Sequence, residues 1–430
     1  MSAVSSARAV VNRLGTAGFK AFFVGGCVRD LLLGRTPQDF DVATSARPEE
    51  ILALYPNAGL VGAHFGVVMV GGIEVATFRS DGAYADGRRP DAVQFETDPR
   101  ADVQRRDFTI NALLMDPATG EIVDYTGGRA DLEAGIVRAI GDPATRFAED
   151  HLRLLRAVRF AARLGFTIEP VTFAAIQSMA GLVSRVAIER VREEISRILT
   201  EGGAKRGFEL LDSTGLLVHV LPEIKALQGV DQPPEFHPEG DVWKHTLTML
   251  DQLRNPSIGL ALGVLLHDVG KPATFRVADR IRFDGHVEAG IEIAHALLMR
   301  LKYPHAVIEQ AEALILNHMR FMDAPRMKTG TLKRFLRMPD FDEHLELHRL
   351  DCLSSNGRLD NYDFVRSQLA ALPPEQLKPT PLLTGRDLIA AGYRPGPAFS
   401  KVLREVEDAQ LEGRIATTPE ALALAQKLLA

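Results

Sequence analysis

The 430-residue chain is poor in cysteine: it has only Cys27 and Cys352, far apart and in no Cys-x-x-Cys pair. This excludes a disulfide framework and a cysteine-type zinc site, and it is typical of a protein of the reducing cytoplasm. No apolar run reaches the roughly 18 residues that a membrane-spanning helix needs. The first residues, MSAVSSARAVVNRLG, also lack the apolar stretch of a secretory signal. Val10, Val11 and Leu14 instead have helical spacing, so we expect a first helix there and a cytoplasmic protein without a membrane partner.

An excess of positive charge is also missing. The chain has 50 Lys and Arg against 56 Asp and Glu, a formal net charge of −6. Because nucleic-acid-binding proteins are usually basic, this balance counts against such a partner unless positive charge is gathered locally. The length exceeds what one core usually organises, and 46% hydrophobic residues are ordinary for a globular protein, so two or more domains are expected.

The two halves of the chain differ in pattern. The first part alternates strand-like and helix-like segments, with strands expected at 21–24 and 40–43 and a hairpin of 66–70 with 73–79 around Gly71-Gly72. From about residue 142 the apolar spacing becomes helical, with helices expected at 145–164 and 188–199. Prolines cluster near 233 and 373 and suggest boundaries there.

Two aspartates lie two residues apart in the sequence QDFDVA. Asp39 and Asp41 project to the same side of a strand if Phe40 packs into the core. Neighbouring carboxylates repel unless a cation lies between them, and Mg²⁺ commonly binds one or two carboxylates together with substrate phosphates. Alone, such a pair is more often a surface turn. Glu74, on a later strand, is either a third carboxylate of this site or part of a solvated strand edge.

Two glycines precede the aspartates. Gly25 and Gly26 leave the backbone bare between a predicted strand and a predicted helix. A helix N-terminus binds phosphate, and Arg29 would add positive charge. The glycines and the aspartates together predict one binding site for a triphosphate and its metal ion.

The segment FVGGCVRDLLLGRTPQDFDVAT, residues 23–44, resembles the signature of the class II tRNA nucleotidyltransferases and bacterial poly(A) polymerases, within the polymerase-β-like nucleotidyltransferases. Further motifs follow in the family's order over most of the chain. The resemblance implies that Asp39 and Asp41 are catalytic and bind Mg²⁺. It also implies that CTP and ATP are the substrates and that a tRNA is the partner.

The sequence RRDFTINAL, residues 105–113, matches a second motif of this family. Its two arginines offer charge to phosphates, and Asp107 and Asn111 are predicted to share one helical face. The resemblance implies that Arg106, Asp107 and Asn111 contact the incoming nucleotide and its sugar. An N-capping Asp107 beside surface arginines is the alternative.

The sequence EDHLRLLRAVRF, residues 149–160, matches the family's nucleotide-selection helix. Asp150 and Arg153 are expected on one helical face, with Arg156 and Arg159 along the same ridge and Arg163 beyond them. By resemblance, Asp150 and Arg153 present hydrogen-bond donors and acceptors to cytosine or adenine, so that the protein rather than a template selects the base. Arg156 and Arg159 would be triphosphate or structural ligands. This stripe would also supply local positive charge, although an exposed salt bridge is the simpler alternative.

Three further segments refine the resemblance. The sequence ERVREE, residues 189–194, resembles the motif that braces the selection helix, with Glu189 and Glu193 expected to pair with arginines. The polar residues 81–90, DGAYADGRRP, correspond to the loop that the family needs to change from CTP to ATP. Their unshortened length favours addition of the terminal A. Residues 62–67, GAHFGV, are uncharged where poly(A) polymerases are usually more basic, which favours a tRNA enzyme.

The second half carries histidines in an order that resembles the HD phosphohydrolases. The expected metal ligands are His245, His267, Asp268, His286, His318 and Asp351. Imidazole with carboxylate suits a transition metal, whose bound water would attack a phosphate ester. The additional His286 and His318 would allow two metal ions. A vestigial site that only helps to hold the tRNA is the alternative.

The sequence thus predicts an α+β protein with a small polymerase-β-like nucleotidyltransferase head followed by mostly helical parts. The head would span 1–137, a helical neck 138–228, an HD domain 229–370 and an RNA-contacting helical tail 371–430. The predicted activity is template-independent addition of CCA to tRNA. The alternatives are an enzyme that adds only A or only CC, a poly(A) polymerase, or chiefly an HD-type phosphohydrolase.

Overall fold

The computed structural model describes residues 2–61, 66–82, 87, 91–233, 235 and 240–429. The chain divides into two compact units, the first formed mainly by the residues up to Lys225 and the second mainly by those that follow. Within these described ranges, no helix has both the length and the apolar character that crossing a membrane demands.

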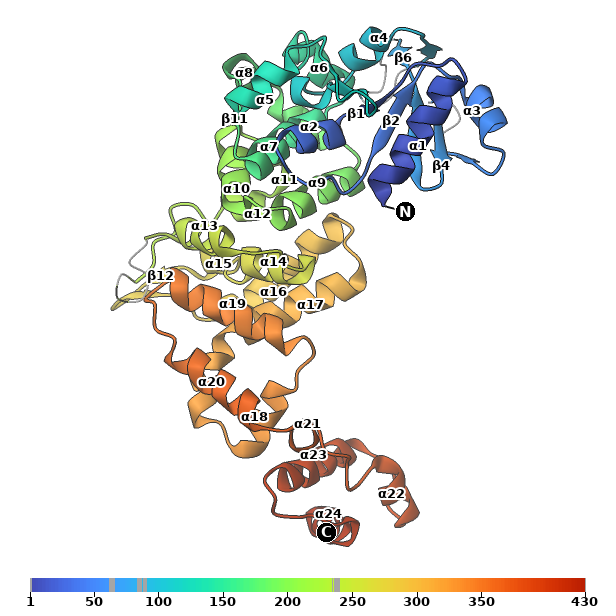
Figure 1. The fold of residues 1–430 in the computed structure, drawn as a ribbon. Helices are drawn as coiled ribbons and strands as arrows, with labels where there is room; N and C mark the ends of the chain where they lie inside the picture. Colours follow the sequence, from blue (N-terminus) through green and yellow to red (C-terminus); the bar gives the residue numbers. More distant parts are fainter. Residues whose placement is uncertain are drawn as a thin grey trace. The chain divides into compact units, whose positions relative to one another are not determined.

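The first unit contains a mixed seven-stranded sheet in the order β3-β4-β5-β2-β1-β8-β9 (Figure 1). Its strands are β1 (Ala21–Val24), β2 (Asp41–Thr44), β3 (Gly59–Leu60), β4 (Val67–Val70), β5 (Ile73–Thr77), β8 (Leu114–Met115) and β9 (Ile122–Val123). Strand β1 pairs antiparallel with β2 and β8, whereas β2 and β5 are parallel. The predicted hairpin is confirmed: β4 and β5 join through Gly71 and Gly72, whose φ angles of 57° and 88° explain why both are glycine.

Helix α1 (Ala3–Thr16) contacts β1, β2 and β5 through its buried Ala7, Val10, Val11 and Leu14, which confirms the predicted first helix. The other small elements of the head are α2 (Gly26–Leu32), α3 (Pro48–Leu54), α4 (Pro99–Gln104) and the strand pair β6 (Arg79–Asp81) and β7 (Val93–Phe95). A hydrophobic cluster that includes Val24, Ala43 and Phe78 joins the sheet to α4 through Val103.

The remainder of the first unit is mostly helical. It consists of α5 (Gly128–Ala134), α6 (Pro143–Glu149), α7 (Arg153–Leu164), α8 (Pro170–Met179), α9 (Ile188–Thr200), α10 (Ala204–Ser213), α11 (Leu217–Val220) and α12 (Pro222–Lys225), with a short parallel pair of β10 (Ile136–Val137) and β11 (Thr167–Ile168). Helix α7 contacts α6, α9 and α10, and nearly all of its residues are buried.

The single helix predicted over 145–164 is wrong, because the chain leaves the helical conformation at Asp150 (φ −143°, ψ 104°). The Asp150 carboxylate accepts a hydrogen bond from the backbone N–H of Leu152 at 3.1 Å. Such a local side-chain bond competes with the helical backbone pattern, so α6 ends and α7 starts as a new helix. The predicted helix at 188–199 is confirmed by α9.

The second unit is helical, as predicted. Its helices are α13 (Val242–Gln252), α14 (Ile258–Leu266), α15 (Lys271–Thr274), α16 (His286–Arg300), α17 (His305–Asn317), η4 (His318–Arg326), α18 (Thr329–Leu336), α19 (Phe341–Ser354), α20 (Asp360–Ala371), α21 (Pro374–Leu377), α22 (Gly385–Ala390), α23 (Pro397–Leu411) and α24 (Thr418–Leu429), with a hairpin of β12 (Arg276–Val277) and β13 (Ile281–Arg282). Helix α14 is buried along almost its whole length and packs closely on α17. The last helices have a hydrophobic cluster of their own, which includes Leu388, Val402 and Ala421. The division into four domains remains a prediction.

Candidate functional sites

The first candidate site lies at the start of β2. Parallel pairing places Asp41 directly opposite Glu74 of β5, and Asp39 lies two residues before Asp41, beyond the buried Phe40. Burial raises the pKa of Asp41, and the charges of Glu74 and Asp39 raise it further, whereas Arg106 opposes them. A carboxylate disfavoured by two others is a position that a bound cation would relieve. The donors are all carboxylate oxygens, which fits Mg²⁺.

The glycine turn lies beside this group. Gly25 has a φ of 75°, and its N–H donates to the Leu113 carbonyl oxygen at 3.2 Å. A Cβ atom at Gly25 would lie 3.3 Å from Nη1 of Arg106, and one at Gly26 would lie 3.7 Å from Nη2 of Arg29. The two glycines therefore leave room for two guanidinium groups, between strand β1 and helix α2 as the sequence predicts.

Arg106 has the features of an anion-binding group. Its Nη2 is 3.1 Å from Oδ2 of Asp102, and this ion pair holds it in place. In the part of the chain that the structure covers, its buried Nε has no hydrogen-bond partner. A buried donor without an acceptor is costly, so a ligand with an oxygen at this position would be favoured.

A chain of hydrogen bonds runs from the glycine turn to α7. Arg29 donates to Oδ1 of Asn111 at 2.7 Å, Asn111 donates to Oδ1 of Asp107 at 3.1 Å, and Arg156 donates to Oδ2 of Asp107 at 2.9 Å. Burial raises the pKa of Asp107, but Arg156 and Asn111 lower it to about 2. Asp107 is therefore ionised, and both of its carboxylate oxygens accept hydrogen bonds. It links the segment 105–113 to helix α7.

The helical face predicted for Asp107 and Asn111 is wrong. The motif forms only a three-residue 3₁₀ helix, Thr109–Asn111, after the extended Phe108. Phe108 bridges to Ala139, and the N–H of Thr109 donates to the carbonyl of Arg138 at 3.0 Å. These bonds to the residues that follow β10 hold the backbone in an extended conformation, so it cannot follow a helical path. Asp107 and Asn111 still meet, through the side-chain bond described above.

The two predicted base-selecting residues occupy different elements, so the single helical face expected for them is also wrong. Asp150 lies in the break before α7, whereas Arg153 is the first residue of α7. Both Asp150 oxygens accept from Arg190 of α9, at 3.1 and 2.8 Å. Arg153 donates to Glu149 at 2.6 Å and to the carbonyl of Arg105 at 3.0 Å. Internal partners thus orient both side chains.

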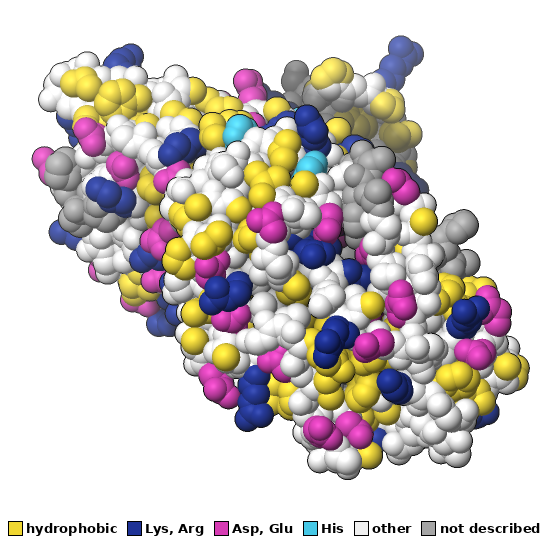
Figure 2. Space-filling view, turned by 90° about the horizontal axis from the view of Figure 1, so that it is seen from above, with side chains coloured by type: hydrophobic (Ala, Val, Ile, Leu, Met, Phe, Trp, Pro, Cys, Tyr) yellow, Lys and Arg dark blue, Asp and Glu magenta, His cyan; other side chains and the backbone are white. Residues whose placement is uncertain are grey.

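The arginines of α7 are matched by carboxylates of α9 and the residue after it. Arg159 is 2% exposed and donates to Glu194 at 2.5 Å, Arg156 lies 3.7 Å from the same carboxylate, and Arg163 donates to Glu201 at 3.2 Å. The stripe therefore carries much less net positive charge than the sequence suggested. On the face seen in Figure 2, basic and acidic side chains are likewise interspersed.

The bracing of α7 by the ERVREE segment is confirmed, but by other residues than expected. Glu194 contacts Arg159 of α7, and Arg190 contacts Asp150 just before that helix. Glu189 instead pairs with Lys302 at 2.6 Å, so its predicted pairing with an arginine is wrong. Arg190 and Glu194 are four residues apart and share one face of α9, just as Glu189 and Glu193 share the next face. Helical periodicity identifies both pairs as residues that share a face. It does not indicate which of the two faces is turned toward α7.

Two sequence segments fall mainly outside the described residues. These are 62–65 of the uncharged segment and 83–86 with 88–90 of the loop at 81–90. The inferences about the terminal A and about poly(A) polymerases therefore stay predictions. Gly87 is described, and its carbonyl accepts from the N–H of His151 at 3.3 Å.

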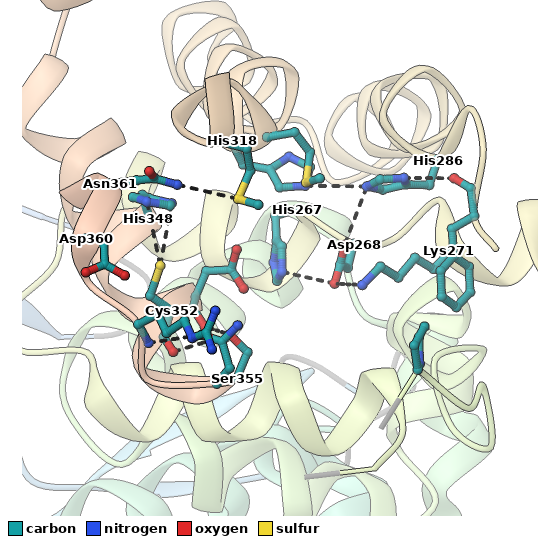
Figure 3. A pocket seen from close by; sticks show the side chains of 17 residues that line it. His267, Asp268, Lys271, His286, His318, His348, Cys352, Ser355, Asp360 and Asn361 are labelled. Carbon is teal, nitrogen blue, oxygen red and sulfur yellow. Dashed lines mark hydrogen bonds and ion pairs between the residues drawn. The ribbon is translucent and has the colours of Figure 1, made fainter. Parts of the chain in front are cut away.

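The second candidate site lies in the second unit and contains all six predicted ligands. Figure 3 labels His267, Asp268, His286 and His318 among them. His245 comes from α13, His267 and Asp268 follow α14, His286 begins α16, His318 begins η4 and Asp351 lies on α19. They form two groups of three, His245 with His267 and Asp351, and Asp268 with His286 and His318. In each group the potential ligand atoms lie within 4.8 Å of one another.

The imidazoles of this site are oriented by the backbone. Nδ1 of His267, His286 and His318 lies 2.9, 2.9 and 2.6 Å from the carbonyl oxygens of Val264, Phe283 and Ile315. An Nδ1–H that donates to a carbonyl leaves Nε2 as the free ligand atom, an arrangement that metal-binding histidines commonly use. Burial and the neighbouring His267 lower the pKa of His318 to about 4, which keeps this imidazole neutral at pH 7.

The two carboxylates of this site are ionised. Burial raises the pKa of Asp268, but the charges of His267 and Lys271 hold it well below its ordinary value. In the same way, burial raises the pKa of Asp351, and His245 lowers it by more. Imidazole nitrogens beside carboxylates are a donor set that fits a transition metal.

Comparison with known protein families gives three matches along the chain. Residues 21–138 match the poly A polymerase head domain, and residues 165–228 match the probable RNA and SrmB-binding site of polymerase A. Residues 287–425 match the putative domain 2 of tRNA nucleotidyltransferase.

Curated relatives match over almost the whole length. The CCA-adding enzyme of Limosilactobacillus fermentum is 31% identical over 97% of this chain and 94% of its own. That of Levilactobacillus brevis is 33% identical over 97% of this chain and 96% of its own. The chain and these two relatives therefore match over nearly all of their lengths.

Solved structures of CCA-adding enzymes also match this chain over nearly its whole length. The CCA-adding enzyme of Bacillus stearothermophilus in complex with CTP has a TM-score of 0.75 and 29% identity, and the match covers 99% of this chain and 98% of that one. The Thermotoga maritima enzyme complexed with tRNA has a TM-score of 0.60 at 20% identity, over 98% of this chain and 94% of that one, which supports the fold alone.

Proposed function

Because this chain belongs to the family of CCA-adding enzymes, we propose that it adds C, C and A in turn to the 3′ end of tRNA, from CTP and ATP and without a nucleic-acid template. One observation carries the assignment of the active site. Asp41 lies opposite Glu74 at the start of β2, the charges of Glu74 and Asp39 both act on it, and Arg106 acts on the same carboxylate while it lies against the turn at Gly25.

The reaction needs little covalent chemistry from the protein. The tRNA 3′ hydroxyl loses its proton to solvent while its oxygen forms a bond to the α-phosphorus of the nucleotide. The bond from that phosphorus to the oxygen that bridges to the β-phosphate breaks, and pyrophosphate leaves. Mg²⁺ held by Asp39 and Asp41, when bound, supplies Lewis-acid stabilisation of the charge on the phosphates. The glycine turn leaves room for the guanidinium groups of Arg29 and Arg106, and the unpaired Nε of Arg106 would offer the triphosphate a hydrogen bond.

Base choice is assigned to Asp150 and Arg153. Their carboxylate and guanidinium offer an acceptor and a donor set that a pyrimidine or purine edge can match. Arg190 and Glu149 hold these two groups in orientation. These two oriented side chains take the role that a template base has in other polymerases.

An assay with ATP alone tests this function against a poly(A) polymerase. A tRNA transcript ending in CC should gain one A, whereas a transcript ending at the discriminator base and an unrelated RNA should remain almost unextended. Long adenine ladders on the unrelated RNA would instead identify a poly(A) polymerase.

Replacing Gly25 with alanine should lower kcat/KM for CTP at least about 10-fold, because the new Cβ would press on Arg106 in a turn with positive φ. Positive φ itself costs a non-glycine residue about 1–3 kcal/mol. Gly18→Ala is the matched control, since Gly18 also has a positive φ but its Cβ would meet nothing within 4 Å. Equal loss of activity in both variants would refute a specific role for the Gly25–Arg106 contact.

Replacing Arg190 with glutamine should lower the preference for CTP over UTP about 10- to 100-fold, because Asp150 would lose the partner that orients it. The measurement is the ratio of kcat/KM for the two nucleotides. Arg192→Gln is the control, because Arg192 lies on the same helix and donates instead to the Lys302 carbonyl. An unchanged ratio with reduced stability would make Arg190 purely structural.

For the histidine–aspartate cluster we propose a second function, metal-dependent hydrolysis of a phosphate ester. The observation that favours it is the arrangement of six ligands in two groups, with their imidazoles anchored through Nδ1. Water would attack phosphorus, the ester P–O bond would break, and the alcohol would leave with a proton. Metal analysis of the purified protein tests the site: we expect one or two equivalents of a transition metal, and none would contradict it.

A further inference from the structure

Asp102 is a fully buried carboxylate in helix α4, just before the RRDFTINAL segment. The residue is 0% exposed, and its neighbour Val103 packs in the hydrophobic cluster that joins α4 to the sheet. The position of Asp102 relative to the sheet is therefore fixed. An aspartate is almost never buried to this extent unless its charge is paired.

Asp102 is paired with two arginines at once. Nε and Nη2 of Arg105 donate to its Oδ1 at 3.0 and 2.7 Å, and Nη2 of Arg106 donates to its Oδ2 at 3.1 Å. Burial raises the pKa of Asp102, but the charges of Arg106 and Arg105 lower it by more, to below its ordinary value. Asp102 is therefore ionised at neutral pH, and both contacts are of the strong, charge-assisted kind.

The contact with Arg106 leads to the triphosphate side of the site. Asp102 holds Nη2 of this guanidinium, and Nη1 lies against the glycine turn, where a Cβ atom at Gly25 would be 3.3 Å away. These two contacts fix the direction of the remaining nitrogen, the buried Nε, which has no acceptor in the described part of the chain. Asp102 thus orients the donor that a phosphate oxygen would meet.

The contact with Arg105 leads to the base-selecting side. The carbonyl oxygen of Arg105 accepts a hydrogen bond from Nη2 of Arg153 at 3.0 Å. This carbonyl belongs to the peptide bond between Arg105 and Arg106. Because Asp102 holds the side chains on both sides of that peptide, the peptide cannot rotate freely, and the acceptor for Arg153 stays in place.

We infer that Asp102 is a positioning residue for both ends of the incoming nucleotide. Through Arg106 it places the donor for the triphosphate. Through the peptide between Arg105 and Arg106 it places Arg153 for the base. The inference rests on the function proposed for the head, and it adds that one buried charge connects nucleotide affinity with base choice.

A purely structural role of Asp102 makes a different prediction. If Asp102 only stabilised the head, its replacement would lower the melting temperature and the fraction of active enzyme. Neither the affinity of the folded enzyme for phosphates nor its choice between bases would then change, because both are independent of how much of the protein is active.

The experiment measures these two properties separately on the full-length protein. Inorganic tripolyphosphate has no base, so its inhibition constant against CTP, at constant free Mg²⁺, reports the triphosphate side alone. The ratio of kcat/KM for CTP and UTP reports the base. In Asp102→Asn we expect inhibition at least about 10-fold weaker and a ratio about 10-fold lower, since displaced positioning groups cost up to about 100-fold.

Arg105→Gln separates the two effects. Asp102 keeps its contact with Arg106 in this variant, so the inhibition constant of tripolyphosphate should stay close to the wild-type value. The ratio for CTP and UTP should fall, because one of the two side chains that hold the peptide is gone. This variant also tests the base side if Asp102→Asn does not fold.

Asp131→Asn is the matched control. Asp131 is 7% exposed, and its Oδ2 accepts from Nε of Arg138 at 3.0 Å and from the hydroxyl of Thr109 at 2.7 Å. It is thus another buried, arginine-paired carboxylate of the same unit. Its replacement should lower stability and leave both the inhibition constant and the ratio unchanged.

Wild-type values of either property in a folded Asp102→Asn protein would overturn the inference while the proposed function stands. Equal changes in Asp131→Asn would overturn it too, because they would make the effect a general loss of structure. A wild-type protein that adds no nucleotide to any transcript would instead overturn the proposed function, and this inference with it.

Discussion

Nucleotide addition by the Asp41→Asn protein should be slower than wild type by about 10³-fold, at saturating CTP and with the fold intact. Asparagine keeps the shape of the side chain and removes the charge that would hold Mg²⁺. Stability should stay the same or rise, because Asp41 is a half-buried carboxylate that burial, Glu74 and Asp39 disfavour. A group whose pKa is raised in the folded state costs stability once it is ionised, and asparagine removes that cost.

The measurement is a single-turnover rate on a tRNA transcript, together with a thermal unfolding curve. Asp116→Asn is a matched control in the same sheet region, because Asp116 uses Oδ1 only to accept from the N–H of Ala118, and asparagine retains that oxygen. Wild-type incorporation by both Asp39→Asn and Asp41→Asn would remove these residues from catalysis. Slow addition with a much lower melting temperature would indicate a structural role.

In the second unit, Asp268→Asn should weaken Mn²⁺ binding by at least about 100-fold, since changes even in the outer partners of metal ligands cost 10- to 100-fold. Asp268 contributes to the group with His286 and His318 and also contacts His267 of the other group. Phosphate-ester hydrolysis should fall with the bound metal, while addition of CCA should continue, because the head carries its own carboxylates.

The control for this variant is His348→Asn. His348 lines the cavity of the histidine–aspartate cluster but belongs to neither ligand group, and its ring stacks on Phe321 with centroids 4.4 Å apart. Its replacement should lower stability and leave Mn²⁺ bound. Loss of Mn²⁺ from His348→Asn, with retention in Asp268→Asn, would contradict the ligand assignment.

Much of this architecture follows from local patterns in the sequence. The hairpin at Gly71-Gly72 is visible because two left-handed residues between apolar alternations require glycine. The six residues of the histidine–aspartate cluster are recognised from their order along the chain, and helices bring them together. Asp39 and Asp41 are recognisable because polar and apolar residues alternate around Phe40. This alternation predicts a strand with both aspartates on one side.

The features that sequence patterns missed depend on pairing between distant segments. The sequence pattern does not decide between two roles for Glu74, and the parallel pairing of β2 with β5 places it opposite Asp41. The break at Asp150 results from a side-chain bond that competes with the helix, and the contact of Arg190 with Asp150 joins residues 40 positions apart. A period of 3.6 residues cannot identify which of two adjacent faces of α9 meets α7.

The central claim is most directly tested with three tRNA transcripts, ending at the discriminator base, at C and at CC. Each is incubated with CTP and ATP, and the products are resolved at single-nucleotide steps. We expect additions of three, two and one nucleotide, each ending in A, with no further extension. Addition only to the transcript ending in CC, addition that stops at CC, or no addition to any transcript would contradict the assignment of complete CCA synthesis to this chain.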